Sequence, residues 1–523
     1  MGKSTGTNPI LYTDYPDPDV IRVGETYYMV STTMHFMPGG VILRSYDLIH
    51  WEIASYVYET LEDTPGQRLA DGKGIYGKGM WAASIRYHKG TFYVCFVAND
   101  TGKTYLYTAN EITGPWEKSI IEGFYHDNSL LFDDDGRVYI AYGNREIYIT
   151  ELNEELTGPK EGGLHRMAVK DTGDVILGYE GAHFYKINGK YYLFFIHWPR
   201  NGLRTEACFC ADSLLGEFTG GDVLSYDLDG MNSGVAQGGI VDTPEGDWYG
   251  ILFQDHGAVG RIPVLVPVSW ENDFPVFGEA GTVQKDICVR MENPKHAYEP
   301  LWCDDDFCYT PGADGKVHLK NPWQWNHIPD NTLWSVTEKT GALRIRSGKL
   351  SKNLVQAVNT LTQRTIGPRC AAEVTLCGDG LKDGDYAGLC ALQGAYGFIG
   401  LTRENGQLFL VVMKHTEPEQ PAWMGSVDAE PGTEVARIPA EGDTLTLCVT
   451  CDFTDGRDTA EFFFRAGDAE QEEDFTKLGE PHKLYFRLDH FVGCRFGLFM
   501  FSTKATGGTA EFSRFRYRTD VSA

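Results

Sequence analysis

The sequence has little positive charge and no long apolar segment. Lysine and arginine number 46 against 73 aspartates and glutamates, which gives a formal net charge of −27. This charge argues against nucleic acid and anionic membrane surfaces as partners. No stretch approaches the length of a transmembrane helix, and the N-terminal run MGKSTGTNPILYTDYP has no apolar core of the kind that a secretory signal needs. We therefore expect a cytoplasmic protein, or one from which a signal has been removed.

The sequence also lacks a cysteine pattern at zinc spacing. Most of the 12 cysteines lie in apolar runs, such as Cys95 in FYVCFV, where cysteine acts as a small apolar residue. The pairs Cys208/Cys210 and Cys448/Cys451 have no second cysteine or histidine pair at a spacing that suits zinc. We expect all the thiols to be structural and reduced.

What the first half does contain is a recurring phrase, in which a turn with Gly-x-x-Tyr joins two apolar runs. Its five glycines are Gly24, Gly90, Gly136, Gly189 and Gly246. Two apolar runs joined by such a turn are typical of a β-hairpin, because glycine takes the positive φ that the turn requires. A hairpin that recurs at a period of roughly fifty residues indicates one blade of a radial array. We therefore predict a five-bladed β-propeller over residues 1–290.

One position of the repeat carries chemically useful side chains. Nine residues before the glycine, the second to fifth repeats have Trp81, Asp127, Glu180 and Gln237, and the shorter first repeat has Asp17 at its matching position. If the first strand of each blade is innermost, these five side chains converge at one end of the axis. Acids there are not explained by structure, because Asp is depleted in strands and costly to bury without partners. The alternative is that they are turn residues at strand entries.

The second half has a different pattern. From about Phe307 the repeated phrase stops, and short alternating strands follow, such as ALRIRSG, CAAEVTLCG and CRFGLFMFST. Gly, Asp and Asn turns separate them at intervals of roughly ten residues, which is typical of an antiparallel β-sandwich. We predict an all-β chain whose second domain, residues 305–523, packs against the propeller and walls off one side of the pocket, with sugar binding in its own right as the alternative role.

Five segments of the propeller half resemble family 43 of the glycoside hydrolases: YPDPDVIRVGETYY, GMWAASIRYHKG, HDNSLLFDDDGR, YEGAHFYKINGKYY and GRIPVLVPVSW. NPWQWNHIPDN and KDGDYAGLCALQGAYGFIGL resemble the concanavalin-like C-terminal module of its β-xylosidase and α-L-arabinofuranosidase branch. The resemblance implies an inverting hydrolase with Asp17 as general base, Glu180 as general acid, and Asp127 as the acid that tunes and orients. These are the three acids at the repeat position. We expect the charge of Asp127 to keep Glu180 protonated near neutral pH, and Asp17 to stay ionised in a solvent-facing position.

The resemblance also implies the rest of the pocket. Phe36 and Met37, in MHFMPGG, resemble the aromatic wall for the terminal sugar, and Trp81 offers its face to a sugar ring. Arg261, in GRIP, resembles the arginine that contacts the sugar or the aspartates. Gln237 stands where many relatives have histidine, and it can hydrogen-bond to a sugar hydroxyl but cannot titrate near pH 7. For Trp81 the alternative is a tryptophan of the blade core, and for Arg261 it is a surface ion pair.

A bound ion is a further expectation from the resemblance. His256, in FQDHGAVGR, resembles a histidine directed into the axial channel toward calcium. Calcium prefers oxygen donors, so we expect water to supply most ligands and the ion to take no direct part in the chemistry. No organic cofactor is expected.

The function that the resemblance implies is an exo-acting glycosidase. It would release terminal α-L-arabinofuranosyl residues, with β-D-xylosyl release as a side activity, from hemicellulose-derived oligosaccharides such as arabinoxylan. The alternative is primarily a 1,4-β-xylosidase on xylo-oligosaccharides, since both pentoses expose similar hydroxyls. A retaining fructosyl enzyme would need acids about 5–5.5 Å apart and the motif WMNDPNG, which is absent. A non-catalytic sugar-binding propeller would have lost at least one of the three acids.

Overall fold

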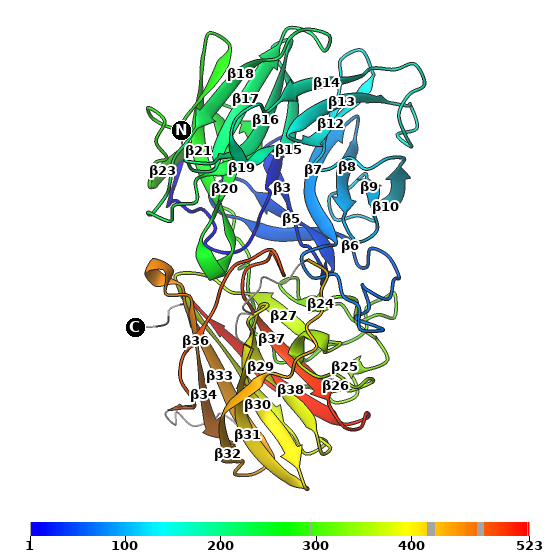
Figure 1. The fold of residues 1–523 in the computed structure, drawn as a ribbon, viewed down its shortest axis with the longest axis vertical. Coiled ribbons are helices and arrows are strands. Elements are labelled where there is room, and N and C mark those ends of the chain that lie inside the picture. Colours follow the sequence, from blue (N-terminus) through cyan, green and yellow to red (C-terminus); the bar gives the residue numbers. More distant parts are fainter. Residues whose placement is uncertain (1, 292–294, 416–423, 468–474, 520, 522–523) are drawn as a thin grey trace.

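The computed structural model describes residues 2–291, 295–415, 424–467, 475–519 and 521. Two β-domains are stacked along the long axis of the molecule, the first coloured blue to green and the second yellow to red (Figure 1). The helices within the described ranges are three single 3-10 turns, η1 (Gly257–Val259), η2 (Leu354–Gln356) and η3 (Thr454–Gly456). None of the described helices is long and apolar enough to cross a membrane. All twelve cysteines are free thiols.

The first domain consists of five antiparallel sheets of four strands each, which confirms the predicted five-bladed propeller. The strands of each sheet pair in chain order, and β1 (Lys3–Thr7) pairs with β23 (Asp286–Arg290) beside the last blade. Blade by blade, the strands are β2 (Asp19–Val23), β3 (Thr26–Ser31), β5 (Gly39–Ser45), β6 (Glu52–Tyr58); β7 (Met80–His88), β8 (Thr91–Ala98), β9 (Lys103–Ala109), β10 (Glu117–Ile121); β11 (Ser129–Phe132), β12 (Val138–Asn144), β13 (Glu146–Leu152), β14 (His165–Lys170); β15 (Val175–Ile187), β16 (Lys190–Pro199), β17 (Thr205–Ala211), β18 (Thr219–Leu224); and β19 (Ala236–Asp242), β20 (Trp248–Asp255), β21 (Arg261–Glu271), β22 (Phe274–Phe277).

The recurring glycine lies in the turn between the first and second strands of every blade. All five glycines have positive φ, from 64° at Gly24 to 87° at Gly90, a conformation that a side chain disfavours. The first strands of neighbouring blades contact one another around the ring. They are therefore the innermost strands, as the repeat predicted.

A buried ion pair fills the centre of this ring. Asp19 on β2 accepts hydrogen bonds from Ile85 N at 2.8 Å and Arg86 Nη1 at 2.6 Å, and its second carboxylate oxygen lies 2.9 Å from His183 Nδ1 on β15. Arg86 also donates to the carbonyl of Leu130 on β11. Burial alone would raise the pKa of Asp19, but Arg86 and His183 hold it below its ordinary value. The pair thus links four blades at the axis through a buried charge that is fully partnered.

The second domain is a β-sandwich of two large antiparallel sheets, as predicted. One sheet has the order β32 (Thr433–Pro439), β31 (Gln407–Lys414), β30 (Gly397–Glu404), β29 (Asp385–Leu392), β37 (Arg495–Ser502), β27 (Leu361–Arg364), β24 (Gln324–Asn326) and β4 (Phe36–Met37). The other has the order β25 (Trp334–Ser335), β26 (Leu343–Arg346), β38 (Thr509–Arg518), β28 (Arg369–Cys377), β33 (Thr444–Asp452), β34 (Thr459–Ala466) and β35 (Thr476–Lys477), and β36 (His482–Lys483) also pairs with β34. The edge strand β4 belongs to the propeller half of the chain, so one sheet crosses the domain boundary.

Buried polar groups also join the two domains. The carboxylate of Asp14, in the propeller half, accepts hydrogen bonds from Arg261 N at 2.8 Å and Gly493 N at 2.9 Å. Arg364 on β27 donates to the backbone carbonyl of Asp14 at 2.9 Å and to Gln324 at 2.8 Å. Separating the domains would leave these buried groups without partners, at a cost of roughly 1–3 kcal/mol each. The two domains therefore form one structural unit.

Candidate active site

The residues at the repeat position meet in one pocket at the end of the propeller axis. The structure brings six of the nine predicted site residues together in its lining: Asp17, Trp81, Asp127, Glu180, Gln237 and Arg261. We call this cavity the carboxylate pocket. Seven further residues line it, among them Arg204, Asp255 and Phe491.

Local backbone geometry aims these side chains. Asp17, Asp127 and Gln237 have φ of 52°, 47° and 60°, a region that non-glycine residues seldom occupy. The pairing of β15 with β16 shifts register on both sides of Glu180, and such bulges redirect a side chain. Backbone strain of this kind clusters at functional sites. Its recurrence in separate blades is consistent with one site built from matching positions.

Asp17 is held by Arg261. The Nη1 of Arg261 donates to both carboxylate oxygens of Asp17, at 2.9 and 3.1 Å, and both side chains are buried. Burial, the largest influence, raises the pKa of Asp17, while Arg261 and Thr32 act in the opposite direction. Asp17 is therefore not solvent-facing as expected, and because burial outweighs the ion pair with Arg261, its pKa lies above the ordinary value.

Asp127 and Glu180 share a neighbouring histidine, His126, which was not among the predicted site residues. His126 Nε2 lies 3.7 Å from Asp127 and 3.5 Å from Glu180, and Asn144 donates a hydrogen bond to Glu180. Burial raises the pKa of Asp127 to about 7, which His126 opposes. Burial would lower the pKa of His126, but Asp127 and Glu180 outweigh it and raise the value to about 9. At neutral pH the two acids thus face an imidazolium, and the position of His126 directly before Asp127 was the available signal.

Gln237 is positioned by a buried acid. Its backbone N–H donates to Glu206 at 2.6 Å, and the second carboxylate oxygen of Glu206 is buried without a partner among the described residues. Burial raises the pKa of Glu206 well above its ordinary value. Glu206 lies within the apolar strand pattern TEACFCA, so an acid in an otherwise apolar strand was the signal for it.

The sandwich contributes an aromatic ring to the pocket. Phe491 lies with its ring 4.1 Å from the guanidinium carbon of Arg261 and 5.8 Å from the ring of Trp81. The ring of Trp81 also lies 5.7 Å from that of His126. One wall of the pocket is therefore aromatic and comes from both domains. No local motif could have indicated Phe491, because its place depends on how the domains dock.

Three expected site residues lie elsewhere. Phe36 and Met37 do not line the carboxylate pocket, because β4 is drawn into the sandwich sheet, where both side chains are buried and Phe36 packs on Arg495 at 3.5 Å. The expected aromatic wall is instead made by Trp81 and Phe491. His256 is not in the axial channel: it is buried after β20, with its ring edge on Tyr12 at 5.3 Å. The axis is filled by the Asp19 ion pair.

A match to a family model agrees with this geometry. Residues 6–275 match the model for glycosyl hydrolases family 43. The chain belongs to family 43. Residues 315–518 match the β-xylosidase C-terminal concanavalin A-like domain, so the family 43 enzyme is a glycoside hydrolase with a concanavalin A-like sandwich.

Known proteins resemble this family 43 chain over most of its length. A protein named β-xylosidase from Formosa agariphila is 27% identical over 99% of this chain and 91% of its own length. A putative β-xylosidase from Xylanibacter ruminicola is 31% identical, over 77% of this chain and 74% of its own. A non-reducing end α-L-arabinofuranosidase from Bacteroides ovatus is 28% identical over 66% of each.

Solved structures show the same architecture. A bifunctional GH43-CE protein from Bacteroides eggerthii has a TM-score of 0.90 and 38% identity over all of this chain, which spans 64% of that protein's length. An engineered family 43 enzyme described as having both endo-xylanase and exo-arabinofuranosidase activity has a TM-score of 0.87 and 29% identity, over 99% of this chain and all of its own.

Proposed function

We propose that this chain is an inverting exo-glycoside hydrolase that releases terminal α-L-arabinofuranosyl residues, with β-D-xylosyl release as a side activity, from hemicellulose-derived oligosaccharides such as arabinoxylan. The observation that carries the proposal is the pocket, in which three carboxylates from three blades lie beside aromatic rings and a buried arginine. The relatives named β-xylosidase and α-L-arabinofuranosidase support the pentose class.

Asp17 and Glu180 have different environments, which suit different roles. Inversion requires a carboxylate that deprotonates water and a carboxylic acid that protonates the leaving oxygen. Asp17 suits the first role, because its ion pair with Arg261 opposes the rise in pKa that burial causes. Glu180 suits the second, because its side chain is 16% exposed against 7% for Asp17 and can meet the departing sugar at the pocket mouth.

Asp127 and His126 lie next to Glu180, the proposed general acid. Asp127 Oδ2, Glu180 Oε2 and His126 Nε2 all lie within 4.8 Å of one another, so a proton on one carboxylate affects the other. His126 therefore contacts both Asp127 and Glu180. We propose that His126 and Asp127 hold the Glu180 carboxyl group in position for its role as the acid.

The calcium ion stays a prediction. His256 Nε2 is buried without a hydrogen-bond partner among the described residues, but His256 belongs to no group of three or more candidate ligands in that part of the chain. Calcium takes 6–8 oxygen ligands, so the residues around His256 do not fit the ion, and no step of the mechanism uses it. A rise in Tm when CaCl2 is added to EDTA-treated protein, absent in His256→Ala, would support the prediction.

Arabinofuranosidase and β-xylosidase activity are separated by initial rates on the two 4-nitrophenyl pentosides. We expect the α-L-arabinofuranoside to be hydrolysed faster than the β-D-xyloside. The reverse order would favour the alternative, a 1,4-β-xylosidase acting on xylo-oligosaccharides, without changing the roles of the acids.

The stereochemistry of the first-formed product tests the mechanism, and Glu180→Gln tests the acid. We expect NMR to show inversion, because a water molecule attacks directly; retention would mean that a carboxylate is the nucleophile.

Glu180→Gln should lose about 10²–10⁴-fold in rate on natural linkages, and less on aryl pentosides, whose leaving group needs little protonation. Wild-type rates on arabino-oligosaccharides would remove Glu180 from the acid role.

A further inference from the structure

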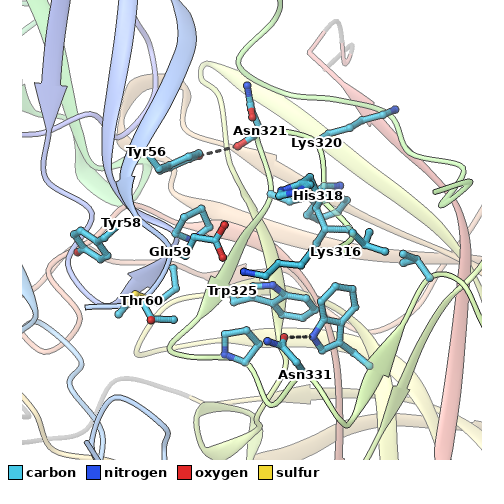
Figure 2. A pocket seen from close by; sticks show the side chains of 18 of the residues that line it. Tyr56, Tyr58, Glu59, Thr60, Lys316, His318, Lys320, Asn321, Trp325 and Asn331 are labelled. Carbon is cyan, nitrogen blue, oxygen red and sulfur yellow. Dashed lines mark hydrogen bonds between the residues drawn. The ribbon is translucent and has the colours of Figure 1, made fainter. Parts of the chain in front are cut away.

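A second cavity, larger than the carboxylate pocket, lies between blade one and the sandwich. Its volume is about 660 Å³, within the range of roughly 300–1,000 Å³ typical of small-molecule sites. One wall is the end of β6 with the residues that follow it, and the other is the chain around β24 and β25 (Figure 2). It shares no lining residue with the carboxylate pocket. We call it the interdomain cavity.

Aromatic rings form much of its lining. Trp325 and Trp334 lie on the sandwich wall with ring centroids 4.9 Å apart and planes at 47°. Asn331 accepts a hydrogen bond from Trp334 Nε1 at 2.8 Å, which fixes that ring. Tyr56 and Tyr58 come from the propeller wall. Rigid aromatic faces suit the C–H faces of sugar rings, because they offer apolar area at little entropic cost.

Polar groups of both charges complete the lining. Glu59 on the propeller wall and Lys316 on the sandwich wall are exposed and extend toward the space between the walls (Figure 2). Within the described part of the chain, neither side chain has an ion pair or hydrogen bond. The other basic side chains of this wall have partners, His318 in Asp314 and Lys320 in a backbone carbonyl. The cavity thus offers one strong acceptor and one strong donor.

We propose that the interdomain cavity is a second carbohydrate-binding site, for a neutral oligosaccharide segment of the hemicellulose backbone. Sugar hydroxyls both donate and accept hydrogen bonds, so Glu59 and Lys316 can each bind a hydroxyl of a neutral chain that lies between the two walls. Occupancy of this site would tether a polymeric substrate and raise its effective concentration at the carboxylate pocket. The identity of the sugar rests on the proposed function.

The test measures binding of xylohexaose to the full-length Glu180→Gln protein by calorimetry. Trp334→Ala should weaken this binding at least tenfold. Because that change removes a sandwich ring, Thr60→Trp is a second variant: Thr60 is an exposed residue of the propeller wall, and the larger side chain fills the cavity without removing a contact. It should weaken binding to a similar extent. Tyr87→Ala, which removes an aromatic ring that is 43% exposed on blade two, should leave binding unchanged.

Two outcomes would overturn the proposal. One is an unchanged xylohexaose isotherm in Thr60→Trp, and the other is tighter binding of an oligogalacturonate than of xylohexaose. The rate on polymeric arabinoxylan relative to the rate on 4-nitrophenyl pentosides should also fall in both variants. A wild-type protein that hydrolyses neither pentoside would overturn the proposed function instead, and the calorimetric result on this cavity would remain interpretable.

Discussion

Asp127 is an active-site residue whose protonation should make the stability of the fold depend on pH. Burial raises its pKa from 3.8 to about 7, so between those values the folded chain holds a proton that the unfolded chain has lost. The contribution of this group to stability therefore falls as pH rises through that window. Asp127→Asn, which cannot ionise, should raise Tm at pH 8 and change it little at pH 4. The gain should be on the order of 2–4 kcal/mol, because neighbouring groups titrate with Asp127.

Thermal unfolding of both proteins at several pH values measures this effect. Glu154→Gln, at an exposed position of the same blade, is the control and should show no pH-dependent gain. A constant difference in Tm between pH 4 and 8 would contradict the buried, proton-holding carboxyl.

Asp17 can be separated from Glu180 by chemical rescue. Asp17→Asn removes the group that deprotonates water, so turnover should fall about 10²–10⁴-fold on every substrate, whatever the leaving group. Added azide should restore part of the rate, because it attacks the anomeric carbon without losing a proton. Rates with and without azide on two aryl pentosides of different leaving-group pKa measure both effects. A loss confined to the poorer leaving group would give Asp17 the role of acid.

At the scale of elements, the bulged strand β15 decides where Glu180 points. Gly181 has φ of 65°, and a Cβ there would lie 2.5 Å from the side chain of Gln237. Gly189, at the hairpin turn after the same strand, has φ of 83° and open space around a Cβ. Alanine should cost each site about 1–2 kcal/mol for the left-handed backbone, but only Gly181→Ala should also lower kcat/KM, by tenfold or more.

The comparison of these two variants separates strain from displacement. Denaturant unfolding should give similar losses for both, and kinetics on an aryl pentoside should distinguish them. Equal kcat/KM in the two variants would mean that Gln237 and Glu180 tolerate the added methyl group.

At the scale of the whole molecule, the sandwich completes the pocket. Phe491 covers Arg261, which in turn holds Asp17, so removing the ring admits water to that ion pair and removes an apolar wall for the sugar. Phe491→Ala should raise KM for pentosides about tenfold and leave the Tm within a few degrees, because the side chain is only partly buried. Leu488→Ala, at a 50% exposed position of the same segment, is the matched control. An unchanged KM in Phe491→Ala would confine the sandwich to a structural role.

The blades and the three acids could be predicted from local sequence patterns. The hairpin turn is a local feature, since glycine at positive φ and flanking apolar runs act over about ten residues, and five copies define the ring. Once the ring is defined, matching positions share one end of the axis, and this places Asp17, Asp127 and Glu180 without any knowledge of packing.

The residues that surround those acids depend on long-range packing and could not be predicted in the same way. Phe36 and Met37 were expected in the pocket, but their segment pairs with β24, almost three hundred residues away, at the edge of the sandwich sheet. Phe491 likewise reaches the pocket only because the two domains dock. His126 and Arg261 set the charges of their neighbours only through distances of a few ångströms, and such distances depend on docking between blades and domains, because electrostatic and packing energies act between atoms in contact and not between positions in a chain.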